Sequence, residues 1–199
     1  MVWKGFFYHE KNYLNSNLFD QNTPVVFTDG SSVFNELQEQ YITHKKGFFI
    51  YDPSGVGKSY FVRHQKENHW IDGDYLWEVC HAFPKGDWWN LNGEEIDQIE
   101  RRADVITEQA KKLGFWIIGA SSVNTVPDAI VIPDFETHLG YIKYREEHNY
   151  DGGMKSDNIE KIKSNRDYFS RFKEQGVPIF TSVDEAVTYL QNQLDNLDC

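Results

Sequence analysis

The residues best suited to chemistry follow an apolar run at 48–51 and precede a segment with a helical pattern. Residues 54–59 read Ser-Gly-Val-Gly-Lys-Ser. Glycines let successive backbone N–H groups turn inward around phosphate oxygens. The helix that follows adds the positive end of its dipole, the Lys58 ammonium suits β- and γ-phosphates, and the Ser59 hydroxyl suits Mg²⁺. The order strand, glycine-rich turn, Lys-Ser, helix is typical of a phosphate-binding loop.

The loop departs from the full pattern G-x-x-x-x-G-K-[ST] at one position, because Asp52 replaces the first glycine. Asp tolerates unusual backbone angles better than most residues, so we expect the turn to form. A carboxylate beside a polyphosphate also needs Mg²⁺ or a basic group to offset its charge. We assign nucleotide binding to Ser54, Gly55, Val56, Gly57, Lys58, Ser59 and Tyr60, with Ser59 as the metal ligand.

Residues 52–59, Asp-Pro-Ser-Gly-Val-Gly-Lys-Ser, resemble the phosphate loop of guanylate kinases apart from Asp52. They also resemble P-loop kinases of nucleotides and small molecules more generally. The resemblance covers eight residues, and no Arg- and Tyr-bearing acceptor segment of a guanylate kinase follows the first helix. It implies a kinase that uses ATP and Mg²⁺, without implying GMP as the acceptor.

Two carboxylates follow the next expected strand, in Asp72-Gly73-Asp74. In small-molecule P-loop kinases an Asp at a comparable position faces the acceptor hydroxyl, and such a carboxylate can orient and deprotonate it. The alternative is a solvated loop in which Asp74 caps a helix that begins near Tyr75. We favour Asp72 as the base because Asp74 is the better cap candidate.

The segment at about 140–175 resembles the helical lid of such kinases, which supplies basic side chains to the transferring phosphoryl group. Arg166 shares a helical face with apolar residues, where a guanidinium usually has an anionic or aromatic partner. A salt bridge at the rim of the core is the alternative. The lid candidates are Lys143, Arg145, Lys155, Arg166 and Arg171, and residues 150–153 read as its hinge.

Two further segments have a functional and a structural interpretation. Trp88 and Trp89 suit stacking on a base or packing in the core. Ser121 and Ser122 suit a Mg²⁺-bound water, a phosphate or a turn cap, and no Walker-B carboxylate precedes them. The seven histidines show no metal-ligand spacing.

The elements that would position these residues alternate between strands and helices. Short apolar runs predict strands at 25–27, 48–51, 70–72, 115–120, 129–132 and 177–180. Helical spacing predicts helices at 33–41, 58–67, 93–113, 156–174 and 183–194. The sequence thus predicts an α/β fold, a P-loop NTPase-type parallel sheet of about five strands sandwiched by helices. Ligands of such sheets bind at the carboxyl ends of the strands, where Asp134 is also expected.

We expect an N-terminal extension at 1–46 that packs on the core and a P-loop kinase-like domain at 47–199, with an appended lid. Two cysteines form no disulfide framework, and no long apolar span occurs, so we expect a cytoplasmic protein without a membrane partner. The net charge of −11 disfavours a broad nucleic-acid surface, although residues 140–175 hold eight Lys/Arg and seven Asp/Glu.

The sequence therefore predicts a Mg-ATP-dependent phosphotransferase for a nucleoside, nucleotide or similar small molecule. Lys58, Asp72, Asp74, Arg145 and Arg166 are its expected catalytic residues. The first alternative is a kinase of polynucleotides or hydroxymethylated DNA bases, served by the N-terminal segment and the tryptophans. The second is a nucleotide-binding regulatory NTPase, and the third is a phosphate loop that Asp52 has made unable to bind nucleotide.

Overall fold

The computed structural model describes residues 32–83, 91–120, 124–148 and 153–195. Five strands form one parallel sheet in the order β2-β3-β1-β4-β5, flanked by helices. This confirms the predicted α/β fold. The predicted strand at 25–27 lies outside the described residues.

The central strand β1 (Phe48–Tyr51) is buried at all four positions, as a continuous apolar run requires in a parallel sheet. It pairs on one side with β4 (Ala129–Val131), where Ile50 is opposite Ala129. On the other side lies β3 (Trp116–Gly119). The chain leaves β1 toward the β2 edge and leaves β4 toward the β5 edge. The end of β1 is therefore at a topological switch point, the usual place for a ligand in such sheets.

The described chain divides into two compact units. The first unit takes in residues 32–48, 65–83, 91–117 and 124–125. The second unit takes in residues 49–64, 118–120, 126–148 and 153–195.

The first unit contains β2 (Trp70–Asp72) and three helices, α2 (Phe34–Gln40), α4 (Gly73–Val79) and α5 (Gly93–Lys112). The longest helix, α5, begins with a capping box, in which Asn92 and Glu95 each bind the other's backbone N–H group. Its Thr107 hydroxyl accepts a hydrogen bond of 3.0 Å from the buried Trp77 indole of α4. This bond satisfies the polar atom of a large core side chain.

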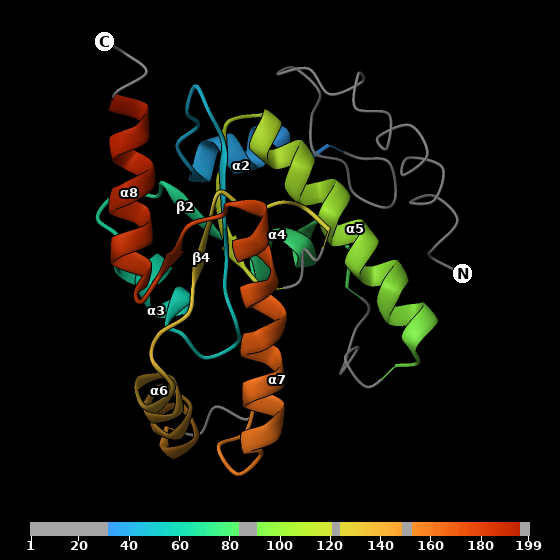
Figure 1. The fold of residues 1–199 in the computed structure, drawn as a ribbon. Helices are drawn as coiled ribbons and strands as arrows, with labels where there is room; N and C mark the ends of the chain where they lie inside the picture. Colours follow the sequence, from blue (N-terminus) through green and yellow to red (C-terminus); the bar gives the residue numbers. More distant parts are fainter. Residues whose placement is uncertain (1–31, 84–90, 121–123, 149–152, 196–199) are drawn as a thin grey trace. The chain divides into compact units, whose positions relative to one another are not determined.

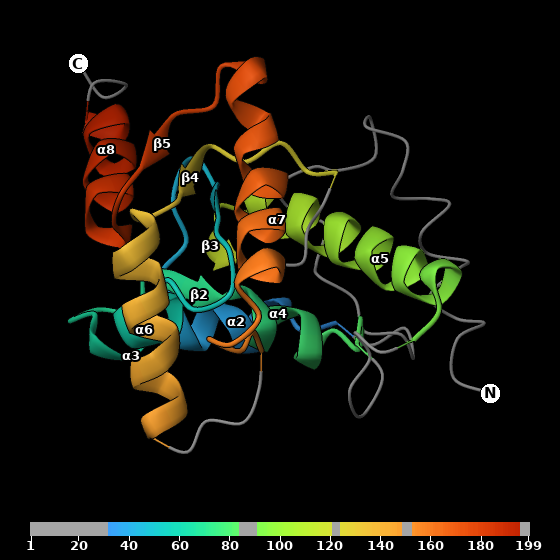
Figure 2. The same ribbon diagram turned by 60° about the horizontal axis from the view of Figure 1, so that its bottom comes forward.

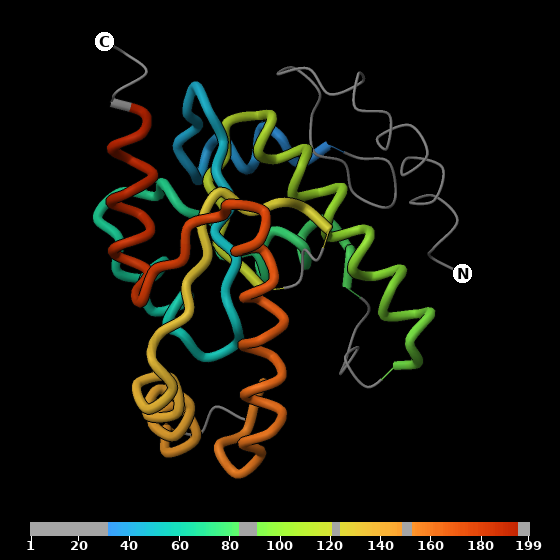
Figure 3. Tube along the Cα trace, in the orientation of Figure 1, coloured from blue at the N-terminus to red at the C-terminus, as the bar shows by residue number. Residues whose placement is uncertain are grey.

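The second unit contains the end of β1, α3 (Lys58–His64), β4 and the path that returns to the sheet. That path runs through α6 (Phe135–Glu147), α7 (Ile159–Ser170), the 3₁₀ turn η2 (Arg171–Gln175), β5 (Ile179–Phe180) and α8 (Val183–Asp195), from yellow to red in Figure 3. Figures 1 and 2 show α6 and α7 side by side. Buried Ile142 of α6 packs there with Met154 and with Ile162 of α7.

Several predicted boundaries are wrong. Helix α3 ends at His64, because the Gln65 side chain accepts from the backbone N–H groups of His69 and Trp70 and turns the chain into β2. Helix α7 begins only after its cap Asn158, and the last predicted turn is the 3₁₀ turn η2. Strands β3, β4 and β5 are one or two residues shorter than predicted.

Helix α6 was not predicted as an element. Asp134 caps it by accepting from the Thr137 backbone N–H at 2.9 Å. This cap follows β4 after only two residues, so a helix begins close to the end of the strand. Among the described residues, no helix is long and apolar enough to span a bilayer.

Gly114 ends α5 in the left-handed region, with φ of 86°. A Cβ atom at this position would lie 2.0 Å from the backbone oxygen of His44. We expect Gly114→Ala to lower the free energy of unfolding by about 3 kcal/mol or more, from the backbone strain and the clash together. Urea unfolding followed by tryptophan fluorescence measures it. Gly93→Ala is the control, because a Cβ at Gly93 meets no atom within 4 Å. Equal midpoints for the two variants would contradict the prediction.

A histidine pair in the first unit is packed against Trp116. The His44 ring stacks on the indole with 3.6 Å between centroids, and its Nε2 lies 3.3 Å from Nδ1 of His69. Burial, with a smaller effect of His69, lowers the pKa of His44 from 6.5 to about 4. His44 is therefore neutral in the folded protein at pH 7.

This shift makes stability depend on pH. The unfolded chain binds a proton at His44 below about pH 6.5, whereas the folded chain binds it only near pH 4. The free energy of unfolding should thus rise by about 1–2 kcal/mol from pH 4 to 6.5 and then level off. This rise is smaller than the full pKa shift would give, because the His44 ring is partly exposed and solvent screens its charge. Urea unfolding across this range measures it. His44→Phe keeps a ring on Trp116 and should flatten this rise; an unchanged slope would contradict the assignment.

Candidate phosphate-binding site

The predicted phosphate loop is the turn between β1 and α3. Gly55 and Gly57 have φ of 97° and 101°, in the region that favours glycine. A Cβ atom on Gly57 would meet no heavy atom within 4 Å, apart from its chain neighbours. On Gly55 it would lie 2.9 Å from Cγ1 of Ile142, so α6 packs closely against this residue. The loop therefore has a packed side at Gly55 and open space at Gly57.

Asp52 does not adopt an unusual backbone conformation. Among the described residues, His81 is the one non-glycine residue with positive φ. The Asp52 N–H donates to the Gly119 carbonyl at 3.1 Å, which continues the pairing of β1 with β3. Its side chain is fully buried. The turn forms without a glycine at this position because its left-handed angles are at Gly55 and Gly57.

The other loop residues take different environments. Val56 is buried and anchors the turn, whereas Lys58 and Ser59 are half-buried at the start of α3. The Lys58 ammonium donates to the Ser59 hydroxyl at 3.5 Å, so the expected phosphate and Mg²⁺ ligands are neighbours. Tyr60 is 71% exposed, and its ring stacks on His64.

Two side chains of α6 contact Ser54 at the start of the turn. The buried His138 ring lies with Nε2 2.9 Å from the Ser54 carbonyl oxygen. Arg145 donates to the Ser54 hydroxyl at 3.3 Å and to the Met154 carbonyl at 2.6 Å. Arg145 thus joins the phosphate loop to the chain that leads into α7.

Arg166 of α7 contacts His138, the α6 residue that binds the Ser54 carbonyl. Its guanidinium donates to Nδ1 of His138 at 3.2 Å and lies over the Phe135 ring at 5.8 Å. The Arg166 guanidinium thus has an aromatic partner, Phe135, and interacts electrostatically with the carboxylate of Asp134. Both partners agree with the prediction for a guanidinium on an apolar face. Because Nδ1 accepts this bond, Nε2 carries the imidazole proton and donates it to Ser54.

Charge and burial keep His138 neutral. Burial lowers its pKa most, Arg166 and Arg145 lower it further, and the bond to Ser54 acts in the opposite direction. A neutral imidazole is the form that accepts at one nitrogen and donates at the other. The electrostatics therefore agree with the bonding pattern.

The remaining basic candidates differ from Arg145 and Arg166. The Arg171 guanidinium lies over the rings of Tyr168 and Phe172, at 3.9 and 4.8 Å. Lys143 is exposed on α6. Lys155 lies near the carboxylate of Glu146 and lowers its pKa, after the larger effect of the Ser156 hydrogen bonds.

The cap assignment in the acidic segment is wrong. Asp72, not Asp74, caps α4, because its carboxylate accepts from the Asp74 backbone N–H at 3.1 Å and the helix begins at Gly73. Asp74 is exposed in the first turn. Both lie in the first unit, and the phosphate loop lies in the second. Their approach to an acceptor beside the loop stays a prediction.

Several predicted residues lie outside the described residues. They include Trp88, Trp89, Ser121, Ser122, the hinge residues 150–152 and most of the N-terminal extension. Gly153 is described, and a Cβ there would lie 2.8 Å from the Ser54 hydroxyl.

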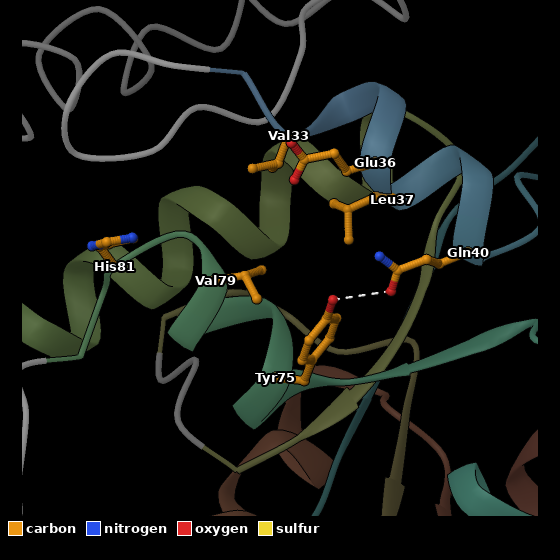
Figure 4. Close-up of a pocket in the computed structure, with 7 residues that line it drawn as sticks. All are labelled: Val33, Glu36, Leu37, Gln40, Tyr75, Val79 and His81. Carbon is orange, nitrogen blue, oxygen red and sulfur yellow. Dashed lines mark hydrogen bonds between the residues drawn. The ribbon is translucent and has the colours of Figure 1, made fainter.

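A cavity of about 260 Å³ lies in the first unit, between α2 and α4 (Figure 4). The Tyr75 hydroxyl donates to the Gln40 side chain at 3.0 Å across it. Val33, Glu36, Leu37, Val79 and His81 complete its lining. None of its lining residues belongs to the phosphate loop.

Sequence reasoning missed His138 because it missed α6. The signal was present, since Asp134 follows Pro133 and precedes Thr137 by three residues, as N-cap residues do. A helix from Phe135 would place His138 and Arg145 on one face, seven residues apart.

In the comparisons with known proteins, no family model and no curated protein matches this chain.

Proposed function

We propose that this chain is a Mg-ATP-dependent phosphotransferase whose acceptor is a nucleoside, nucleotide or similar small molecule. The observation that carries the proposal is the turn after the central strand, with positive φ at Gly55 and Gly57, open space at Gly57, and Arg145 bonded to Ser54. Backbone amides in such a turn, a lysine and an arginine together suit the charge of a polyphosphate.

The residues at the loop fit Mg-ATP. The loop amides and Lys58 would hold the β- and γ-phosphates, and Ser59 would hold the metal. Bound Mg²⁺ would neutralise charge that develops on the phosphate oxygens. Arg145 would add positive charge at the phosphoryl group, and its bonds to Ser54 and Met154 already orient its guanidinium.

In the proposed reaction, the acceptor hydroxyl oxygen forms a bond to the γ-phosphorus while the bond from that phosphorus to the β–γ bridging oxygen breaks. ADP leaves with the electron pair of the broken bond. The hydroxyl proton passes to the carboxylate of Asp72 or Asp74. Catalysis would come mostly from positioning and electrostatics.

The test is transfer from γ-labelled ATP with Mg²⁺ to a panel of acceptors. The panel holds nucleosides, nucleoside monophosphates, small metabolites, oligonucleotides and DNA with hydroxymethylated bases. Label on a small acceptor supports the proposal, and label on nucleic acid alone favours a polynucleotide or base kinase. Label released only as phosphate favours a regulatory NTPase. Absence of both transfer and a thermal shift with Mg-ATP would overturn nucleotide binding.

A further inference from the structure

A chain of three groups connects α7 to the phosphate loop. Arg166 donates to Nδ1 of His138 at 3.2 Å, and His138 donates from Nε2 to the Ser54 carbonyl at 2.9 Å. The imidazole of His138 is fully buried, whereas Ser54 and Arg166 are half-buried. Ser54 directly precedes Gly55, the first residue of the loop with positive φ.

Neighbouring side chains pack around the three hydrogen-bonded groups and fix their arrangement. Ile142, one turn after His138 on α6, packs against Gly55 and, through the apolar cluster with Ile162, against α7. Arg145, two turns after His138, binds the Ser54 hydroxyl. Phe135 lies under the Arg166 guanidinium. The Ser54 carbonyl and hydroxyl are thus each held by a different side chain of the same helix.

We propose that His138 is a positioning residue for the phosphate loop, and that Arg166 acts through His138 and not on the phosphoryl group. This inference rests on the proposed function, because it assumes that the loop binds nucleotide. The Ser54 carbonyl and the Gly55 N–H belong to the same planar peptide group. A hydrogen bond to this carbonyl therefore fixes the direction of the Gly55 N–H. Removing the bond should weaken nucleotide binding at the loop.

Two amide substitutions separate the two bonds of the imidazole. The amide nitrogen of Gln reaches about as far as Nε2, so His138→Gln can keep the donor to Ser54. The shorter Asn side chain reaches only the position of Nδ1, so His138→Asn loses that donor. We expect His138→Asn to raise the Kd for Mg-ADP about tenfold and His138→Gln to change it less than about threefold. His138→Asn should also raise KM for ATP while KM for the acceptor stays unchanged.

Arg166→Met tests the second half of the inference, since it keeps an apolar stem over Phe135 and removes the donor to His138. If Arg166 acts through His138, the substitution should raise the Kd for Mg-ADP about threefold in the wild-type background and have no further effect beside His138→Asn. Equal losses in both backgrounds would mean that Arg166 acts on the nucleotide directly, and would overturn this half. If circular dichroism shows that His138→Asn does not fold, Arg166→Met is compared in the wild-type and His138→Gln backgrounds instead. Its effect on the Kd for Mg-ADP should then be smaller in the His138→Gln background.

Failure of the inference can be told from failure of the proposed function. A wild-type protein that binds neither Mg-ADP nor Mg-ATP overturns the proposed function and this inference with it. Wild-type binding that His138→Asn leaves unchanged overturns only the positioning role. Loss of affinity in both His138→Gln and His138→Asn would show that the imidazole serves packing, and would also overturn it.

Discussion

The Lys58→Ala variant should lose phosphate transfer by a factor of about 10² or more while its fold stays intact. Lys58 is the first residue of α3 and is half-buried beside Ser59. Removing its ammonium removes positive charge that the transferring phosphoryl group needs. Alanine is the best helix former, so α3 should persist. Transfer from γ-labelled ATP measures the loss, and circular dichroism measures the fold.

Lys163→Ala is the matched control. Lys163 is an exposed residue of α7 that pairs with Glu160 at 3.1 Å, and such surface pairs contribute little to stability. Its transfer rate should equal that of the wild-type protein. Full activity in Lys58→Ala would contradict the assignment of the loop as the phosphate site.

The Asp72→Asn variant should lower turnover by about 10²-fold or more, and should change Mg-ATP affinity and stability little. Asp72 caps α4 through its side-chain oxygen. Asparagine caps helices about as well as aspartate, so the substitution keeps the structural role and removes the charge that a general base needs. Steady-state kinetics with a small-molecule acceptor, together with urea unfolding, separates the two roles.

Asp74→Asn is the companion variant, because sequence reasoning preferred Asp72 on the mistaken ground that Asp74 caps the helix. The cap uses only the backbone N–H of Asp74, so this substitution should leave stability unchanged. A turnover loss in Asp74→Asn alone would assign the base to Asp74. Full turnover in both variants would show that neither carboxylate faces the acceptor.

The parts of the fold that could be predicted are those with strong local patterns. The apolar run of β1 and the amphipathic α5 are present within one or two residues of the predicted bounds. The loop glycines could also be assigned, since the need for positive φ at Gly55 and Gly57 is a property of the backbone. These features depend on neighbours close in sequence.

The features that sequence reasoning missed depend on distant contacts. The end of α3 is a local exception, because Gln65 accepts from the Trp70 backbone N–H only five residues later, a bond that a helical pattern does not indicate. In the structure Arg166 donates to the His138 imidazole, 28 residues earlier in the chain, a partner that its place on an apolar helical face did not name. The partner of His138 is Ser54, 84 residues earlier in the chain. No periodicity or spacing connects residues so far apart.

Local patterns were sufficient to predict the α/β class, the turn at residues 54–59 and the residue types that suit a phosphate, because strand runs and glycines act over a few residues. The basic side chains that reach this turn became known only from the folded arrangement of the helices. Packing of α6 against Gly55 brings His138 and Arg145 to Ser54, and packing of α7 on α6 brings Arg166 to His138. The physical reason is that helix packing and buried hydrogen bonding choose these partners, and both act between residues that are remote in sequence.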